Sequence, residues 1–216
     1  MYIAKNLNTI KSQLPAHVTL VAVSKTKPVA DLMEAYDAGQ RIFGENKIQE
    51  MTDKWEVMPK DIEWHMIGHV QTNKVKYMAP YVSLIHGVDS LKLLQEINKQ
   101  AAKNNRVIDC LLQVYIAEEE SKFGLDKQEL DEILSSTEIK QLKNIRIVGL
   151  MGMATFTENK NQIEKEFKHL KTIFDKFTIH NSQFTILSMG MSGDYQLAIS
   201  CGSTMVRIGS SIFGSR

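Results

Sequence analysis

The sequence predicts an α/β protein in which eight parallel strands and their connecting helices close into a (β/α)8-type TIM barrel. Short apolar runs rich in β-branched residues alternate with amphipathic stretches along the whole chain of 216 residues. This alternation is typical of a parallel sheet with right-handed crossovers. Several runs are almost entirely apolar, as expected for strands covered on both faces. Alternation alone also fits an open, doubly wound sheet, and the count of eight strands favours closure.

The predicted strands recur along the whole sequence and are followed by helical patterns. They are residues 20–25, 41–45, 64–68, 84–88, 108–115, 145–151, 184–189 and 205–209. Gly39 follows the predicted helix 29–38 as a C-terminal cap, and Ser90 is the predicted N-cap of a later helix. The clearest helix covers residues 163–177, where apolar residues recur three and four positions apart. No linker or strict repeat divides the chain, so we expect a single domain over residues 1–216.

Composition and charge exclude several classes of function. The chain has 26 Lys and Arg against 25 Asp and Glu, a formal charge of +1. Nucleic-acid-binding proteins usually have a strongly basic face, so this balanced composition does not indicate nucleic-acid binding. No apolar run of about 18 residues predicts a membrane helix, and the amphipathic N-terminal stretch differs from a signal peptide. Cys110 and Cys201 have no metal or redox spacing, so we expect buried thiols in a cytoplasmic protein.

A lysine stands at the end of the first predicted strand, where barrels of this kind carry their chemistry. Active sites of TIM barrels lie at the C-terminal ends of the strands. Lys25 follows an apolar run that helices should cover. Partial burial of an amine favours its neutral form, which imine formation requires. The structural alternative is that Lys25 extends to the barrel rim, as we expect for Lys27.

Small polar residues gather after the last two predicted strands and indicate an anion-binding site. Ser188 and Ser192 lie at and after the end of the seventh strand, and Gly209 and Ser210 lie at the end of the eighth. Backbone N–H groups and hydroxyls in such loops hold phosphate in barrels, and helix 194–200 would add its N-terminus. Ordinary loops have a similar composition, so the prediction depends on the two stretches being adjacent.

Arg207 lies on the eighth predicted strand, two residues before Gly209, and its side chain should face the barrel interior. A guanidinium inside a barrel is costly unless it meets an acceptor. Two partners are open at this point. Arg207 would pair with a structural carboxylate such as Glu45, or it would hydrogen-bond a ring nitrogen or an anion of a ligand.

Other familiar motifs are absent or weak. His65 and His69 have the i, i+4 spacing of a metal-binding helix. Gly68 and the strand-like residues before it argue against a helix here, so we expect no metal site. The sequence contains no P-loop, no GxGxxG dinucleotide motif and no nucleophile elbow with a Ser-His-Asp triad.

Several sequence motifs follow one another in a fixed order from near residue 18 to the C-terminus. The most specific are VSKTKP at 23–28 and GSTMVRIG at 202–209, accompanied by FGEN at 43–46 and by GLM at 149–151. In this combination the chain resembles the pyridoxal phosphate homeostasis protein family, single-domain relatives of the alanine racemase N-terminal barrel. It departs from the family pattern at Lys47, Met66 and Val70. Lys47 introduces a charge near the mouth of the barrel.

The resemblance implies a modified TIM barrel like the N-terminal domain of alanine racemase, with pyridoxal 5′-phosphate held as a Schiff base on Lys25. In the implied site, Arg207 faces the pyridine nitrogen, the loops after the last two strands hold the phosphate, and three further residues line the ring. The implied cofactor-binding residues are Lys25, Asn46, His65, Met151, Ser188, Ser192, Arg207, Gly209 and Ser210.

The same resemblance argues against strong catalysis. A guanidinium stays charged and disfavours protonation of the pyridine nitrogen, which makes the ring a weak electron sink. A racemase needs acid/base groups on both faces of its substrate. In the racemase relatives the second group comes from another domain, for which 216 residues leave no room. We therefore predict a cofactor-binding protein that stores and delivers pyridoxal phosphate and so affects amino-acid and keto-acid pools.

Two other functions remain open. One is a weak amino-acid racemase that uses the Lys25 aldimine with His65 or Tyr195 as the second group. The other is a barrel aldolase with a Schiff-base lysine and no cofactor. The expected partners are pyridoxal phosphate and the apo-enzymes that receive it, and we expect a monomer. Lys74 and Lys122 are candidates for transient cofactor capture near the mouth, or else ordinary surface lysines.

Overall fold

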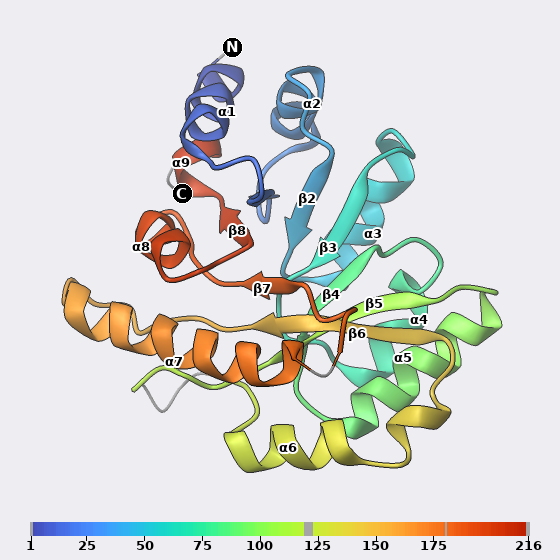
Figure 1. The fold of residues 1–216 in the computed structure, drawn as a ribbon. Helices are drawn as coiled ribbons and strands as arrows, with labels where there is room; N and C mark the ends of the chain where they lie inside the picture. Colours follow the sequence, from blue (N-terminus) through green and yellow to red (C-terminus); the bar gives the residue numbers. More distant parts are fainter. Residues whose placement is uncertain (1, 119–122, 180, 215–216) are drawn as a thin grey trace.

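A computed structural model shows that the eight strands close into one parallel barrel, with each strand paired to its sequence neighbours and β8 paired to β1 (Figure 1). The structure describes residues 2–118, 123–179 and 181–214. The predicted (β/α)8 architecture is confirmed, and an open doubly wound sheet is excluded. The strands are β1 Thr19–Val23, β2 Ile42–Glu45, β3 Glu63–Met66, β4 Leu84–Val88, β5 Ile108–Gln113, β6 Ile145–Met151, β7 Ile186–Ser188 and β8 Met205–Ile208.

The predicted strands 84–88 and 145–151 match β4 and β6 residue for residue, and the other six overlap strands that differ at one or both ends. Five of these six predictions extend one or two residues past the C-terminal end of the strand, where the chain leaves the sheet earlier than predicted. The first strand ends at Val23, so that Lys25 lies in the following turn. The fifth ends at Gln113, and Val114 pairs only through an isolated bridge with Leu125.

Helices surround the barrel and include those that the sequence predicts. The helices are α1 Tyr2–Gln13, α2 Val29–Asp37, α3 Ile48–Val57, α4 Val75–Met78, α5 Leu91–Lys103, α6 Lys127–Ser135, α7 Lys160–Thr178, α8 Tyr195–Ser200 and α9 Ser210–Phe213, with 3-10 turns η1 Thr72–Lys74 and η2 Ile139–Gln141. Ser90 caps α5 by accepting the Leu93 amide at 3.2 Å, and Gly39 follows α2 with a φ of 88°. Among the described residues, no helix combines the length and the apolar character needed to span a bilayer.

Apolar side chains form two layers, one outside and one inside the barrel wall. The outer layer lies between strands and helices and contains large buried side chains such as Phe43, Trp64 and Phe167. The second layer, which we call the interior apolar layer, fills the barrel itself. Its buried members are Val21, Leu84, Leu111, Val148, Met151 and Met205. On β4 and β8 alternate residues face opposite sides, so the residues that follow Leu84 and Met205 by two positions, His86 and Arg207, also point into the barrel.

The turn after β1 is held from the outer side of the barrel by Lys54 of α3. Its ammonium group donates to the Ser24 carbonyl, to Glu45 Oε1 and to Glu50 Oε1, each at 2.8 Å. Ser24 Oγ donates to the same Glu45 oxygen at 2.6 Å. Glu50 also accepts the amide of Thr26, a β-branched residue with a φ of 65° that such residues rarely adopt. The network therefore fixes the backbone on both sides of Lys25.

This network takes two charges out of water. Glu45 is fully buried, and 7% of the Lys54 side chain is exposed. Burial raises the pKa of Glu45, and hydrogen bonds from Lys54 and Ser24 act in the opposite direction. Glu45 Oε2 is buried with no partner among the described residues. Since a buried charge is tolerated only when paired, Lys54 and Glu45 depend on each other.

We predict that Lys54→Met lowers the free energy of unfolding by about 3 kcal/mol, because it leaves the Glu45 carboxylate buried without its cation. Urea denaturation followed by circular dichroism measures the change. Combining Lys54→Met with Glu45→Gln should restore part of the loss, since no unpaired charge then remains. Lys99→Met is the matched control, because Lys99 is 62% exposed and forms only a surface pair with Glu96. Its effect should stay within about 0.5 kcal/mol, and an equal loss in both single variants would contradict the assignment.

Candidate functional site

Arg207 of β8 is buried inside the barrel, with 3% of its surface exposed. Its Nη1 donates to the carbonyl and hydroxyl oxygens of Ser188 at 2.9 and 2.6 Å, and its Nη2 donates to the Gly152 carbonyl at 3.1 Å. Burial lowers the pKa of Arg207 to about 10, which still leaves the guanidinium charged at neutral pH. The structural alternative that paired Arg207 with Glu45 is wrong, because Glu45 faces α3 and binds Lys54.

Two histidines extend this contact across the barrel. Ser188 Oγ lies 3.0 Å from Nδ1 of His86, and Nε2 of His86 lies 3.0 Å from Nδ1 of His65. Burial lowers the pKa of His65 to about 3, and burial with the neighbouring His65 and Arg207 lowers the pKa of His86 well below its usual value. Both imidazoles are therefore neutral at pH 7. We call Arg207, Ser188, His86 and His65 the interior chain.

Lys25 and the loops after β7 and β8 meet at the C-terminal end of the barrel. Lys25 is half-buried, two residues beyond the end of β1. Gly209 packs against the same strand end, since a Cβ placed on it would lie 3.1 Å from the Val23 carbonyl oxygen. Its amide donates to Ser192 Oγ at 3.2 Å, which brings the two predicted anion-binding loops into contact. Ser210 follows as an exposed residue at the start of α9.

The remaining predicted residues come from other strands at the same end. Asn46 is half-buried directly after β2. Gly68, which follows β3, packs so closely on Asn46 that a Cβ would approach the Asn46 carbonyl oxygen to 2.4 Å, so no side chain fits there. Met151 ends β6 in the interior apolar layer and pairs in register with Ser188. The nine predicted residues thus lie on six strands or in the segments that follow them, toward the C-terminal end of the barrel.

The other sequence candidates have partners of their own. His69 stacks on Phe123 with the ring centroids 4.7 Å apart and lies 3.6 Å from Asp89, so it does not share a ligand position with the buried His65. The described residues contain no group of three or more His, Cys, Asp or Glu side chains that could hold a metal ion. The Tyr195 hydroxyl donates to Gln13 of α1 at 2.7 Å, and the Tyr195 ring belongs to the outer apolar layer.

The lysines near the site have different surroundings. Lys27 donates to the Phe213 carbonyl at 3.1 Å and is half-buried, in agreement with the rim position expected for it. Lys74 is exposed in η1, and Lys122 lies outside the described residues.

Cys110 and Cys201 are buried free thiols, as expected.

His86 is the functional candidate that the sequence analysis missed. It lies in the middle of β4, a strand that is buried along its whole length, and the sequence analysis assigns it no role beyond the predicted strand 84–88. The available signal was its position two residues after Leu84, because that spacing points both side chains into the barrel. A buried polar ring at such a position needs a partner, and Ser188 and His65 provide it.

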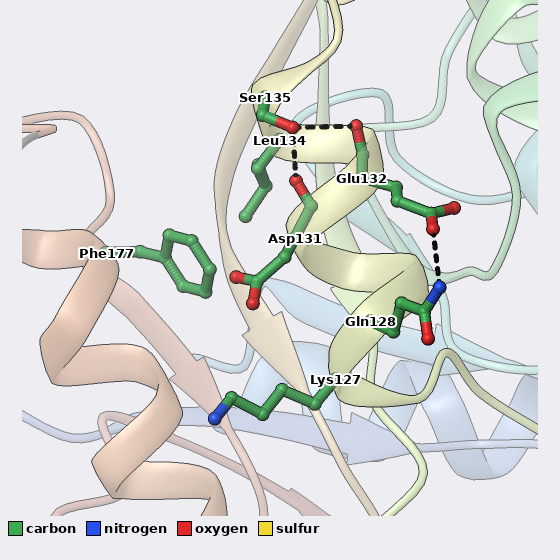
Figure 2. Close-up of a pocket in the computed structure, with 7 residues that line it drawn as sticks. All are labelled: Lys127, Gln128, Asp131, Glu132, Leu134, Ser135 and Phe177. Atoms are coloured by element: carbon green, nitrogen blue, oxygen red, sulfur yellow. Dashed lines mark hydrogen bonds between the residues drawn. The ribbon is translucent and has the colours of Figure 1, made fainter.

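Two surface pockets lie away from these residues. One, of about 740 Å3, lies between α6 and α7, where Phe177 faces Leu134 and Asp131 (Figure 2). Polar side chains around it are engaged locally: Gln128 donates to Glu132 at 2.9 Å, and Ser135 donates to the Asp131 carbonyl at 2.7 Å. A second, of about 350 Å3, lies near the start of β1 and β2. Neither includes a predicted site residue, so the convergence of side chains at the strand ends defines the candidate site.

Comparisons with known proteins agree with this assignment of the fold. The family model described as the N-terminal domain of alanine racemase matches residues 2–216. Proteins named pyridoxal phosphate homeostasis protein from Aquifex aeolicus and Escherichia coli are 41% and 39% identical to this chain. The two alignments cover 91% and 94% of this chain, and 86% and 87% of the relatives.

Solved structures have the same barrel. PipY of Synechococcus elongatus with PLP bound aligns with a TM-score of 0.88 at 35% identity, over 98% of this chain and 100% of PipY. Alanine racemase from E. faecalis aligns with a TM-score of 0.80 at 15% identity, over 100% of this chain and 58% of the racemase. At that identity the racemase shows the fold alone. Since the family model and the homeostasis proteins match almost the whole chain, this chain belongs to the alanine racemase N-terminal domain family and, within it, to the pyridoxal phosphate homeostasis proteins.

Proposed function

We propose that this protein binds pyridoxal 5′-phosphate through Lys25 and serves the intracellular homeostasis of that cofactor, holding it and passing it on without robust catalysis. The observation that carries the proposal is the meeting, at one end of the barrel, of a half-buried lysine, a buried arginine and two polar loops in contact. The names of the relatives and the PLP-bound structure of PipY support it.

The residues at this opening fit the chemical parts of the cofactor. Its aldehyde requires a primary amine, which Lys25 offers. Its phosphate requires N–H and O–H donors, and Ser192, Gly209 and Ser210 offer these. Its pyridine nitrogen accepts a hydrogen bond, and Arg207 is a donor that cannot accept. Asn46, His65 and Met151 would line the ring from the neighbouring strands.

The same residues are poorly suited to catalysis. When bound, the cofactor supplies an electron-withdrawing ring, but the Arg207 guanidinium disfavours the proton on its nitrogen that strengthens this effect. A racemase would also need a second acid/base group opposite Lys25. The Tyr195 hydroxyl is engaged by Gln13 on the outer side of the barrel. His65, with a pKa lowered to about 3 by burial, is a weak base at neutral pH.

We further propose that the protein acts as a monomer in the cytoplasm and that its recipients are apo-enzymes. The buried, unpaired thiols of Cys110 and Cys201 fit a reducing compartment. A lysine at an opening formed by strand ends and loops permits exchange of a bound aldehyde, since imine formation is reversible in the presence of water.

Lys25 should be the attachment point, so Lys25→Ala should abolish the visible absorption band that stays with the protein after free pyridoxal phosphate is removed by gel filtration. Borohydride should fix the cofactor on Lys25 in the wild-type chain, and peptide mass spectrometry would locate it. Lys27→Ala is the matched control, because Lys27 lies two residues away and donates to Phe213. It should keep the band. A colourless wild-type protein, as the cofactor-free aldolase alternative requires, or attachment to another lysine would contradict the proposal.

Ser192 should contribute to binding of the phosphate, so Ser192→Ala should weaken binding of pyridoxal phosphate about tenfold through loss of one hydrogen bond to a charged group. Binding of pyridoxal, which lacks the phosphate, should change by less than about twofold. The control is Ser200→Ala, since Ser200 ends α8 and its hydroxyl donates to the Leu197 carbonyl. Equal losses for the two ligands would show that Ser192 does not contact the phosphate.

Delivery of the cofactor predicts that the loaded protein activates an apo-enzyme faster than it releases free cofactor. The activation rate should rise with the concentration of the apo-enzyme, measured in stopped-flow experiments with a trap for free pyridoxal phosphate. A rate that equals spontaneous release would count against delivery. Lys25-dependent exchange of the α-proton of an amino acid with deuterium would instead support the racemase alternative.

A further inference from the structure

The interior chain is a continuous row of hydrogen bonds that begins at a charged group. All four side chains are buried: Ser188 and His86 fully, and Arg207 and His65 with 3% of their surface exposed. The chain joins β8, β7, β4 and β3, and the two imidazole rings are tilted by 50° with their centroids 5.1 Å apart. Its members therefore cross the barrel from one wall to the other.

The direction of each proton in this chain follows from its first member. Arginine only donates, so Ser188 Oγ accepts from Arg207 at 2.6 Å. The one other side chain in contact with Ser188 Oγ among the described residues is His86. A buried hydroxyl proton needs an acceptor, and Nδ1 of His86 is the acceptor that this contact offers to Ser188. With Nδ1 accepting, the proton of the neutral His86 ring lies on Nε2. This Nε2–H then donates to Nδ1 of His65, whose own proton must lie on Nε2.

We propose that His86 is a positioning residue of the cofactor site, which acts through Ser188 to orient the Arg207 guanidinium and fixes His65 as an Nε2–H donor. Three of the five N–H groups of Arg207 are committed to Ser188 and Gly152. Two N–H groups have no hydrogen-bond partner among the described residues, and they are the donors that a ligand nitrogen would meet. Their direction depends on Ser188, which His86 holds from the opposite side. This role of Arg207 rests on the proposed function.

Removal of His86 would disturb the chain at its centre. Without an acceptor at this position, the Ser188 hydroxyl can turn to another direction, and one of the contacts that orient Arg207 weakens. Leu84 provides a comparison on the same strand and the same inner face, because it belongs to the interior apolar layer and makes no polar contact. Loss of packing at Leu84 should not change the direction of the guanidinium.

The proton positions can be measured without any cofactor. Long-range 1H–15N correlation spectra of the 15N-labelled protein report which nitrogen of each imidazole carries the proton, and His86→Asn and His65→Asn assign the signals. We expect Nε2–H for both rings and no titration between pH 5 and 8, because burial lowers the pKa of both. A proton on Nδ1 of His86, or a titrating His86, would overturn the proposed direction.

The positioning role is tested by three variants loaded with pyridoxal phosphate. His86→Leu should weaken binding about tenfold, as expected for the loss of one hydrogen bond that orients a charged donor, and should shift the visible band. His86→Asn should stay within about threefold of the wild type with an unshifted band, since Asn Oδ1 can replace Nδ1 as the acceptor for Ser188. Leu84→Ala should lower thermal stability without shifting the band.

The outcomes separate this proposal from the proposed function. A wild-type protein that takes up no pyridoxal phosphate refutes the proposed function, and the proton positions still decide the direction of the chain. A wild-type protein that binds the cofactor, with a His86→Leu variant of equal affinity and identical band, refutes the positioning role alone. A band shift in Leu84→Ala equal to that in His86→Leu would reduce the role of His86 to general packing and so refute it as well.

Discussion

A guanidinium inside the barrel must find acceptors for its protons, and much of the candidate site is arranged around this requirement. Arg207 obtains them from the backbone and hydroxyl of β7 and from the backbone that follows β6. Ser188 can accept a hydrogen bond from Arg207 because its own hydroxyl proton has an acceptor in the neutral ring of His86. Because its guanidinium only donates, Arg207 thus sets which ring nitrogen of His86 and of His65 carries the proton, through contacts between buried side chains.

A second buried charge plays the corresponding part outside the barrel wall. Lys54 joins α3 to the strand end before Lys25, while Glu50 holds the amide directly after it. The two networks share no residue, yet both support residues at the C-terminal end of the barrel. Lys25 therefore lies on backbone that residues of α3 hold in place. The expected ligand donors of Arg207 are instead oriented by contacts inside the barrel. Helix α3 thus supports the turn that carries Lys25, and the barrel interior supports Arg207.

Strand-end reasoning located Lys25, Ser188 and Arg207, because a barrel places the C-terminal ends of its strands together whatever their sequence separation. The cofactor itself came from the family resemblance, since no pattern of charge or spacing specifies a pyridine ring. The partners of Arg207, Ser188 of the neighbouring strand β7 and Gly152 after β6, could not be obtained in this way, because contacts between strands depend on their stagger. Lys54 was missed for a related reason: a lysine on an amphipathic helix is usually solvated, and only the tertiary fold shows that this one is buried.

The interior apolar layer gives the barrel a closed base. Leu84, Ile186 and Met205 each lie two residues before His86, Ser188 and Arg207 on the same strands, so hydrocarbon fills the barrel below the polar row. A molecule bound above that row would therefore reach the polar side chains from the C-terminal ends of the strands and not through the apolar side of the barrel.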